Sequence, residues 1–260
     1  MNKVALIFIG TNEYSNLFPI WKNSVDNFFL NDCEKTIFAF TDRPTENYFK
    51  DQNVVVKQVD HLNWPFITLF RFKMMNAISN ELSNFDYIFF LDADLFPKSD
   101  ITLDEVVSKG KDLVGVQHPG NYKWLKTRTN PEWDPLDRTP GSTASVGDLK
   151  ISDFGTEFYH QGCFWGGESS SILDMVAKLD NNVDLDLSNN IVASWHDESH
   201  MNRYFWDNIS RVNTLSPLYA IPEDGDWKYT LFKGMTCKML HASKSEIKKL
   251  LPQFKGGTPG

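Results

Sequence analysis

The sequence predicts an α/β fold, and two observations lead to that prediction. Short apolar runs rich in β-branched and aromatic residues alternate with segments of helical periodicity, the order expected of strands joined by helices. With 260 residues and 41% hydrophobic content, the chain is also long enough to bury a full core. The predicted strands cover residues 4–9, 35–41, 53–59, 87–91 and 112–117, and the predicted helices cover residues 18–30, 66–83 and about 168–180.

The first predicted strand is Val4-Ala-Leu-Ile-Phe-Ile9. It is too short to span a membrane and lacks the basic flank and small-residue cleavage site of a signal peptide, so we interpret it as a core strand. In the predicted helix 66–83, Arg71 falls one residue off the apolar stripe. We therefore expect Arg71 to point along the sheet edge toward Asp92.

The second half of the chain has a different pattern. The stretch from Gly120 to Gly155 is rich in Pro, Thr, Asp, Ser and Gly, and a loop of that length is usually functional or mobile. Asp197 and Glu198 are expected in the first turn of a later helix, because the helix dipole and open backbone amides favour carboxylates there.

Charge and cysteine content exclude several classes of function. The net charge of −8 and the pI near 5.2 argue against a nucleic-acid partner, which would require a basic surface. The three cysteines at positions 33, 163 and 237 are widely spaced and form no CxxC pair. They indicate neither a disulfide framework nor a zinc site, and they favour a reducing compartment.

A pair of carboxylates ends the strand 87–91. Asp92 and Asp94 follow the apolar run, so both are expected at the C-terminal edge of the sheet, where open α/β sheets bind ligands. Two carboxylates there suit a Mg²⁺ or Mn²⁺ ion that keeps open positions for substrate phosphate oxygens. By itself this triplet is a weak signal, since solvated acids are common at strand ends.

Several separated segments resemble glycosyltransferase family six, which contains the ABO blood-group transferases and the α-1,3-galactosyltransferases. The strongest match is Trp195-His-Asp-Glu-Ser-His-Met-Asn-Arg-Tyr-Phe205 followed by Leu215-Ser-Pro-x-Tyr219, against Trp-His-Asp-Glu-Ser-His-Leu-Asn-Lys-Tyr and Leu-Ser-Pro-Glu-Tyr in the family. The other matching segments, in family order, are Phe40-Thr-Asp-x-Pro44, Asp92-x-Asp94, His118-Pro-Gly-x-Tyr122, Phe158-Tyr159, Phe164-x-Gly-Gly167 and Lys238-Met-Leu-His-Ala-Ser-Lys244. The last resembles Lys-Met-x-Trp-x-Thr-Lys.

The resemblance implies a GT-A glycosyltransferase fold over residues 1–255. A Rossmann-like half that binds the nucleotide-sugar and the metal, about 1–117, is expected to be fused to an acceptor-binding and catalytic half, about 118–255. Residues 256–260 are expected to form a tail. Family members are retaining enzymes that move galactose or N-acetylgalactosamine from UDP to the 3-hydroxyl of a sugar acceptor.

By position, Glu198 matches the family's catalytic carboxylate. It could attack the anomeric carbon and form a covalent intermediate, or it could stabilise an oxocarbenium-like transition state while the acceptor enters on the leaving-group face. The alternative is an ordinary carboxylate at a helix start. His196 and Asp197 adjoin Glu198 in the family's order, and we assign them to substrate binding.

On the donor side, Asp92 and Asp94 match the metal ligands, Asp92 being assigned to substrate binding as well. The remaining donor-binding assignments are Ile9, Gly10, Thr11, Tyr14, Trp64, Arg71 and Lys244. Tyr14 could stack on uracil or serve only as a loop aromatic, and Arg71 would contact the donor sugar or Asp92. Lys244 would contact the diphosphate, or it could belong to a solvated helix face.

The other substrate-binding assignments concern the acceptor and the choice of donor sugar. His118 matches a residue that contacts the acceptor, and Trp195 an aromatic that packs against the acceptor ring. Gln161, Gly162 and Cys163 occupy the tripeptide that discriminates between donors. Because Cys163 is bulkier than the Ala that excludes an N-acetyl group in the family, the sequence favours an unsubstituted hexose.

The resulting hypothesis is a retaining enzyme that depends on Mn²⁺ (or Mg²⁺). It transfers a hexose from UDP-galactose, or next from UDP-glucose, to a glycan or oligosaccharide acceptor through an α-linkage, expected to be α-1,3. The family's membrane anchor has no counterpart in this sequence, so we expect a cytoplasmic enzyme of a bacterial cell or a phage-infected host. The alternatives are a UDP-sugar hydrolase, a nucleotidyltransferase and a sugar-binding module that has lost catalysis.

Overall fold

The computed structural model describes residues 1–119, 135–149, 159–223 and 234–254. Its centre is a seven-stranded sheet with strand order β3-β2-β1-β4-β7-β6-β8, so the α/β prediction is confirmed. The strands are β1 (Lys3–Ile9), β2 (Glu34–Thr41), β3 (Val54–Gln58), β4 (Tyr87–Leu91), β6 (Leu113–Gln117), β7 (His160–Glu168) and β8 (Val212–Leu215). All neighbours are parallel except that β7 runs antiparallel to both β4 and β6.

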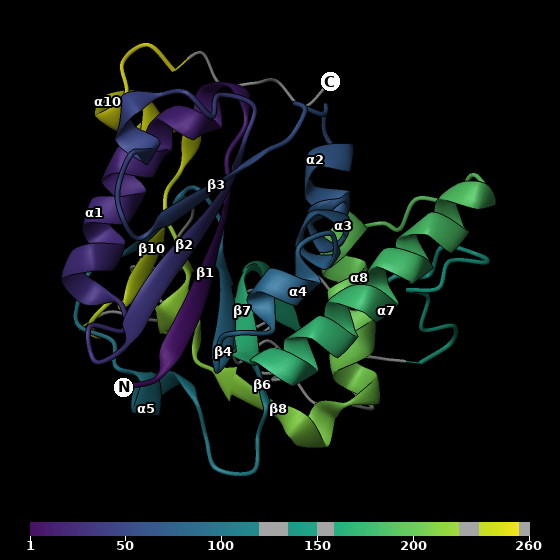
Figure 1. Cartoon of the computed structure of the whole chain (residues 1–260). Helices are drawn as coiled ribbons and strands as arrows, with labels where there is room; N and C mark the ends of the chain where they lie inside the picture. Colours follow the sequence, from purple (N-terminus) through teal and green to yellow (C-terminus); the bar gives the residue numbers. More distant parts are fainter. Residues whose placement is uncertain (120–134, 150–158, 224–233, 255–260) are drawn as a thin grey trace.

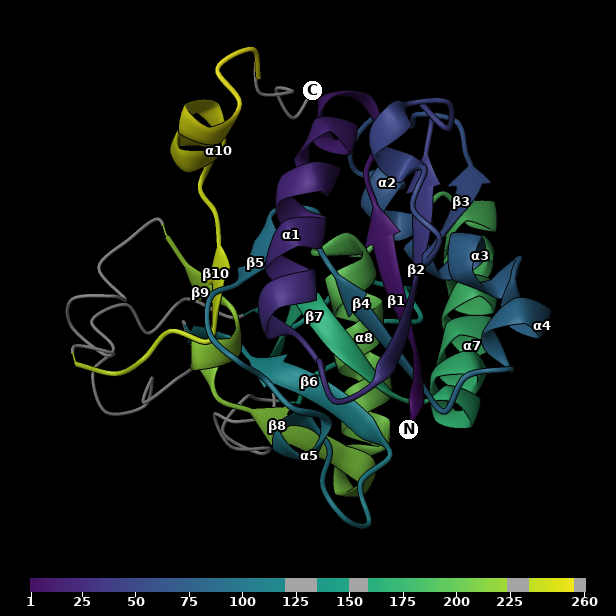
Figure 2. The ribbon, with the colours of Figure 1, turned by 60° about the vertical axis from the view of Figure 1, so that its left-hand side comes forward.

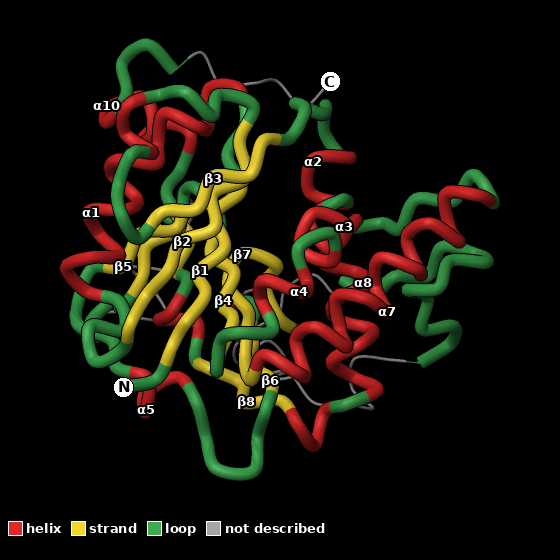
Figure 3. The backbone as a smooth tube through the Cα atoms, in the orientation of Figure 1, coloured by secondary structure: helices red, strands yellow, loops and turns green. Residues whose placement is uncertain are grey.

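Helices cover both faces of this sheet (Figure 1 and Figure 3). The α-helices are α1 (Phe18–Phe28), α2 (Phe66–Leu69), α3 (Arg71–Asn76), α4 (Ser79–Leu82), α5 (Leu103–Val106), α7 (Ser169–Ser188), α8 (His196–Asp207) and α10 (Lys244–Leu250). The 3₁₀ turns are Asn12–Leu17, Asn47–Phe49, Ile209–Arg211 and Pro217–Tyr219. In Figure 1, α1 lies on one side of the sheet, whereas α3, α7 and α8 lie on the other.

Side chains along β1 alternate between two separate hydrophobic cores, one on each face of the sheet. Val4, Leu6 and Phe8 belong to the cluster on the α1 face, whereas Ala5 and Ile7 belong to the cluster on the α7 face. Successive strand residues point to opposite faces of a sheet, so a strand covered on both sides must be apolar at every position. This explains why the predicted strands appear in the sequence as unbroken apolar runs.

The prediction of one helix over residues 66–83 is wrong, since the segment forms the three short helices α2, α3 and α4. The helical backbone is interrupted at Phe70 and at Ile78, where ψ is 9° and 20°. The most buried residues here include Leu69, Phe72 and Met75, which are spaced by three. Arg71, which the sequence places off the apolar stripe, is also buried, at 5% exposure.

Strand β7, which lies between β4 and β6, has glycine at two positions where a side chain would clash with neighbouring segments. A Cβ on Gly166 would lie 2.3 Å from the Phe89 ring, and one on Gly167 would lie 2.1 Å from the carbonyl oxygen of Asp112. Gly167 also has φ +146°, which L-residues rarely adopt. The sheet thereby joins strands from before and after residue 117.

A small second sheet holds the C-terminal segment against the main sheet (Figure 2). Its strands, in the order β5-β10-β9, are β5 (Leu95–Pro97), β10 (Met239–His241) and β9 (Ile221–Pro222). Because β5 directly follows Asp94, this pairing brings residues near 241 to the Asp92-x-Asp94 turn.

Part of the long predicted loop can be described. Residues 135–149 form turns and bends with neither helix nor strand, whereas residues 120–134 and 150–158 and the expected tail lie outside the described residues. Among the helices of the described ranges, none has the length and apolar character needed to cross a membrane.

Candidate active site

Two cavities adjoin at the C-terminal edge of the sheet, and they share Trp64, Thr68, Arg71 and Asp92 as lining residues. One has a volume of about 440 Å³ and is also lined by His118, Gln161, Gly162, Cys163, Ser194, Trp195, His196, Asp197, Glu198, Pro222 and His241. The other has a volume of about 490 Å³, and its lining includes Ile9, Thr11, Tyr14, Asp94 and Lys244. All the predicted site residues except Gly10 therefore line one of two connected spaces. After the roles expected of their residues from the sequence, we call the 440 Å³ space the transfer cavity and the 490 Å³ space the nucleotide cavity.

A bulge in β7 shapes the transfer cavity. Gly115 of β6 pairs with Trp165, but the next residue, Val116, pairs with Gln161, so the intervening part of β7 has no partner on β6. That unpaired stretch holds Gly162 and Cys163. Bulges of this kind redirect side chains and backbone groups next to functional sites.

The bulge brings a backbone amide within hydrogen-bonding distance of Glu198. The amide of Gly162 donates a hydrogen bond to Glu198 Oε2 at 2.7 Å, and the Tyr159 hydroxyl donates one to Oε1 at 2.7 Å. A Cβ on residue 162 would come within 3.3 Å of the Glu198 side chain, so a larger residue here would press on the carboxylate. Glu198 is held in the first turn of α8, as the sequence predicts, and lines the transfer cavity.

Burial is the main influence on the charge of Glu198. It raises the pKa of the carboxyl to about 7, although the hydrogen bonds from Tyr159 and Gly162 favour the charged form and limit the rise. A carboxylate held at this pKa can change protonation state near neutral pH, which is the property required of many catalytic acids and bases.

Arg71 connects the two cavities. Its guanidinium is 3.0 Å from Asp197 Oδ2 and 3.4 Å from Asp92 Oδ1, and it donates a 2.8 Å hydrogen bond to the carbonyl oxygen of Gly162. The same group lies over the Phe90 ring, 4.4 Å from its centroid. Burial alone would lower the pKa of Arg71, but Asp197 and Asp92 raise it, so the side chain stays cationic between two carboxylates.

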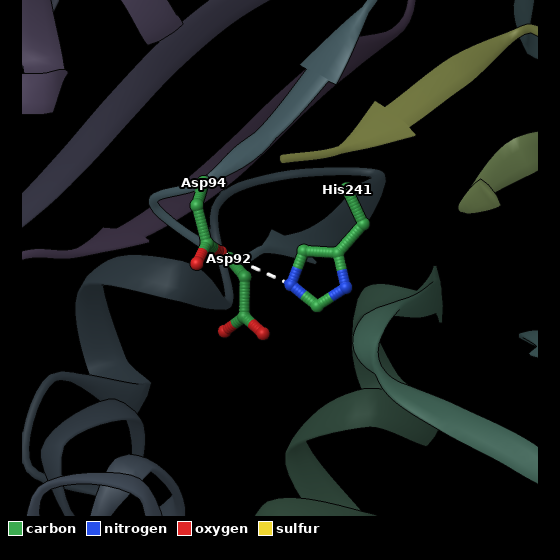
Figure 4. Close-up of side chains that lie close together, drawn as sticks. All are labelled: Asp92, Asp94 and His241. Carbon is green, nitrogen blue, oxygen red and sulfur yellow. Dashed lines mark hydrogen bonds and ion pairs between the residues drawn. The ribbon is translucent and has the colours of Figure 1, made fainter. Parts of the chain in front are cut away.

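Asp92, Asp94 and His241 form a cluster at the junction of the cavities. One ligand atom from each lies within 4.8 Å of the others, and His241 Nε2 is 3.2 Å from Asp94 Oδ1. Figure 4 shows the three side chains gathered around one space, with Asp92 and Asp94 on the turn after β4 and His241 at the end of β10. Two carboxylates and an imidazole fit a divalent cation.

The electrostatics of the cluster favour added positive charge. Burial raises the pKa of Asp92 to about 6, against the influence of Arg71. For His241 burial would lower the pKa, but the Asp94 and Asp92 carboxylates raise it to about 9. A concentration of carboxylates that stabilises one cation in this way will also stabilise a metal ion.

The nucleotide cavity is lined by the loop after β1. Thr11 Oγ1 and His61 Nδ1 are 2.9 Å apart, and the Tyr14 ring meets Phe254 edge to face at 5.3 Å. Gly10 faces neither cavity; its Cβ would lie 2.5 Å from the Phe8 ring, so its small size serves packing. Lys244 begins α10 and lines this cavity beside Asp94.

Exposed aromatic rings form the mouth of the transfer cavity. Trp64 is 50% exposed and Trp195 is 48% exposed. The Trp64 and His196 rings meet at 4.5 Å. His196 adopts φ +52°, a strained conformation for a residue with a side chain, directly beside Asp197 and Glu198. His118 lies deeper, and burial lowers its pKa to about 4, so it is a neutral hydrogen-bonding group.

Sequence reasoning assigned no role to two residues of this site, Tyr159 and His241. Both were within quoted motifs, Tyr159 in Phe158-Tyr159 and His241 at the position where the family pattern Lys-Met-x-Trp has Trp. His241 replaces the family's Trp in the same segment that carries Lys244, the residue expected to contact the diphosphate. That replacement could have drawn attention to His241. The Tyr159–Glu198 contact spans 39 residues and had no local signal.

Comparison with known proteins identifies the class to which this site belongs. The family model of Glycosyltransferase family 6 matches residues 3–248. Over 220 residues the chain is 31% identical to the O-antigen biosynthesis glycosyltransferase WbnI of Escherichia coli, covering 85% of this chain and 88% of that protein.

Vertebrate relatives are more distant. Histo-blood group ABO system transferase 2 of Rattus norvegicus is 25% identical over 83% of this chain and 62% of its own length. Globoside alpha-1,3-N-acetylgalactosaminyltransferase 1 of Homo sapiens is 25% identical over 83% of this chain and 60% of its own length.

The chain belongs to glycosyltransferase family 6. Its mostly parallel sheet with helices on both faces is consistent with a GT-A type fold, and its reaction is the transfer of a sugar.

Proposed function

We propose that the chain transfers a hexose from a UDP-sugar to a hydroxyl group of a glycan with retention of the anomeric configuration. The observation that carries this proposal is that Glu198 and Asp92 line one cavity, with Arg71 joined to Asp92 and to the neighbour of Glu198. The diphosphate would then lie at the Asp92-x-Asp94 turn, and the sugar would extend toward Glu198.

Asp92 and Asp94 would hold a divalent cation, Mn²⁺ in preference to Mg²⁺. When bound, such an ion neutralises the diphosphate and the charge that develops on the departing UDP. Arg71, which is 5% exposed, lies 3.4 Å from Asp92 Oδ1 and would help to hold that carboxylate in place. Lys244, at the rim of the nucleotide cavity, would add positive charge to the diphosphate.

Glu198 would act at the anomeric carbon. Its two oxygens are oriented by Tyr159 and Gly162, so the carboxylate is positioned before the donor binds and loses little freedom when the reaction occurs. The geometry is compatible with a covalent intermediate and with front-face attack by the acceptor. In both routes the Glu198 carboxylate stabilises positive charge on the sugar.

The favoured donor sugar is galactose, with glucose next. Cys163 is 4% exposed and lines the transfer cavity, so its thiol would occupy volume beside a bound donor sugar. The names of several relatives specify α-1,3 transfer, which supports the same linkage here. Exposed Trp195 and Trp64 at the cavity mouth suit an acceptor sugar, whose apolar face can stack on indole.

A donor panel tests the proposal. The purified chain would be incubated with UDP-Gal, UDP-Glc, UDP-GalNAc or UDP-GlcNAc and an array of oligosaccharides, with Mn²⁺ or with EDTA, and products would be detected by mass spectrometry. We expect hexose addition from UDP-Gal, or next from UDP-Glc, with Mn²⁺ only, and none for Asp92→Asn. Addition of an N-acetylhexosamine instead would contradict the donor assignment, and equal transfer in EDTA would contradict the metal role.

A further inference from the structure

We propose that His241 is a third protein ligand of the metal, so that the ion is held by two carboxylates and one imidazole. This rests on the proposed metal role of Asp92 and Asp94 and adds the histidine and a consequence for metal choice. The site would take a first-row transition ion such as Mn²⁺ in preference to Mg²⁺, and it would bind that ion before UDP arrives.

The backbone holds His241 beside the acidic turn. In the β5–β10 pair, His241 lies opposite Leu95, the residue that follows Asp94. The amide of Ala242 donates a 2.9 Å hydrogen bond to the carbonyl oxygen of Asp94. The flanking residues Met239 and Ala242 are 0% and 7% exposed. The histidine is therefore carried by packed strand, and no loop has to close to bring it to the metal.

The side chains complete the arrangement. The ligand atoms of Asp92, Asp94 and His241 lie within 4.8 Å of one another, a separation from which small rotamer adjustments reach one ion. The three side chains are 27%, 18% and 31% exposed, so the space between them opens to the cavities. His241 lines the transfer cavity and Asp94 the nucleotide cavity, which places the ion between the two.

The ligand chemistry decides which ion is favoured. Mg²⁺ takes oxygen ligands and keeps most of its water, whereas imidazole nitrogen favours transition ions. Two carboxylates alone would depend on the donor phosphates to complete a weak site. A third, fixed protein ligand makes binding less dependent on UDP, because preformed side chains lose less conformational freedom when the ion binds.

The competing role for His241 is that of a counter-ion to Asp94. The 3.2 Å contact between them fits that role as well as it fits two ligands of one ion. As a counter-ion His241 keeps a proton on both ring nitrogens, whereas as a ligand it must release one of these protons when the metal binds. The two roles therefore differ in one observable: only a ligand places its nitrogen in the coordination shell of the metal.

The test measures Mn²⁺ directly, without donor or acceptor. Mn²⁺ and Mg²⁺ would be titrated calorimetrically into wild type, His241→Ala and the matched control His118→Ala, which removes another histidine of the same cavity. Pulsed EPR of bound Mn²⁺ would then detect magnetic coupling to ¹⁴N of a coordinated imidazole. Asp92→Asn serves as the reference for loss of one of the two carboxylate ligands proposed above.

We expect wild type to bind Mn²⁺ without UDP, more tightly than Mg²⁺, and to show nitrogen coupling. Loss of outer-shell partners alone weakens metal binding ~10-fold or more, so His241→Ala should weaken Mn²⁺ binding at least that much and abolish the coupling. His118→Ala should retain both. If His241→Ala does not fold, persistence of the coupling in His61→Ala, His118→Ala and His196→Ala, the other histidines that line the two cavities, assigns it to His241 by elimination.

The failures are distinguishable. Mn²⁺ bound without nitrogen coupling, or with unchanged coupling in His241→Ala, overturns the role of His241 and leaves the metal role of the aspartates intact. Wild type that binds no Mn²⁺, with or without UDP, overturns the proposed metal role itself.

Discussion

The Tyr159 hydroxyl donates a 2.7 Å hydrogen bond to Glu198 Oε1, which ties the start of β7 to the first turn of α8. Tyr159 is 2% exposed, so this hydrogen bond is sheltered from bulk water. The other oxygen of Glu198 is bound by Gly162. Tyr159 is therefore a positioning residue: it orients the carboxylate and favours its charged form.

Tyr159→Phe tests that role. Burial raises the pKa of Glu198 to about 7, and the Tyr159 hydrogen bond opposes the rise. Without the hydroxyl the pKa should rise further, by about 1 unit for a charge-assisted hydrogen bond of ~1.5 kcal/mol. Because the reaction needs the carboxylate, kcat/KM should decrease as pH falls through 7 in wild type, and this limb should move to higher pH in the variant.

The measurement is the pH profile of kcat/KM at saturating Mn²⁺. The ring of Tyr159 is retained in the variant, so packing is preserved, and circular dichroism checks it. An acid limb at the same pH in both proteins would show that Glu198 does not set the profile.

Glu198→Gln should lower turnover by orders of magnitude and leave donor affinity within severalfold. The lost charge acts mainly in the transition state, so binding of UDP-sugar in the ground state is little affected. Rapid-quench kinetics and calorimetry with the donor separate the two effects. Near-normal turnover in this variant would assign catalysis to another residue.

The same variant carries a stability signature. The pKa of Glu198 is about 7 in the folded protein and about 4.5 in the unfolded chain. Between these two values the unfolded chain has released the proton that the folded protein still holds, so wild type loses stability as pH rises from about 4.5 to 7. Relative to Glu198→Gln, wild type should therefore melt at progressively lower temperature over that range. A constant difference in melting temperature would argue against a buried charge at Glu198.

Removing the charge of Arg71 should destabilise the fold. Asp197 and Arg71 are nearly fully buried, with side chains 9% and 7% exposed, so Arg71→Met leaves a carboxylate without its counter-charge. Breaking a buried ion pair in this way costs about 3–5 kcal/mol of unfolding free energy. Urea denaturation measures the loss, and Arg71→Met with Asp197→Asn should recover part of it. If Arg71→Met loses no more unfolding free energy than the double variant does, the ion pair between Arg71 and Asp197 is contradicted.

Cys163→Gly should raise the use of UDP-GalNAc relative to UDP-Gal. The thiol is buried at the cavity wall, and glycine would free the volume an N-acetyl group requires. Steric discrimination of this size is worth about 1–3 kcal/mol, or roughly 10- to 200-fold in the ratio of kcat/KM values. Cys163→Ala is the matched control, and its ratio should stay close to that of wild type, because the side chain still occupies part of this volume. An unchanged ratio in Cys163→Gly would place donor selection elsewhere, with Gln161 and Trp165 the next residues to test.

The sequence was most informative where local pattern decides structure. The apolar runs predicted the strands, since β1 and β4 are covered on both faces. The acids after β4 were predicted at the sheet edge, because a strand end fixes their position. One helix was predicted over residues 66–83, where the structure has the three short helices α2, α3 and α4. The spacing of the apolar residues fits either arrangement, so it could not reveal the two interruptions.

Long-range packing was beyond such reasoning. The strands β5, β9 and β10 are two or three residues long and have no detectable period. His241 therefore reaches Asp94 through a pairing that the local pattern does not reveal. The contact of Tyr159 with Glu198 likewise joins residues 39 positions apart, which no local pattern pairs.

The central claim, retaining and metal-dependent transfer from a UDP-hexose, is tested most directly by the configuration of the new bond. Proton NMR of the product formed from the preferred donor would be recorded with Mn²⁺ and after its removal by EDTA. Our account predicts an α-linked hexose, from the α-configured donor, formed with Mn²⁺ and lost with EDTA. A β-linked product, or equal rates after removal of the metal, would contradict it.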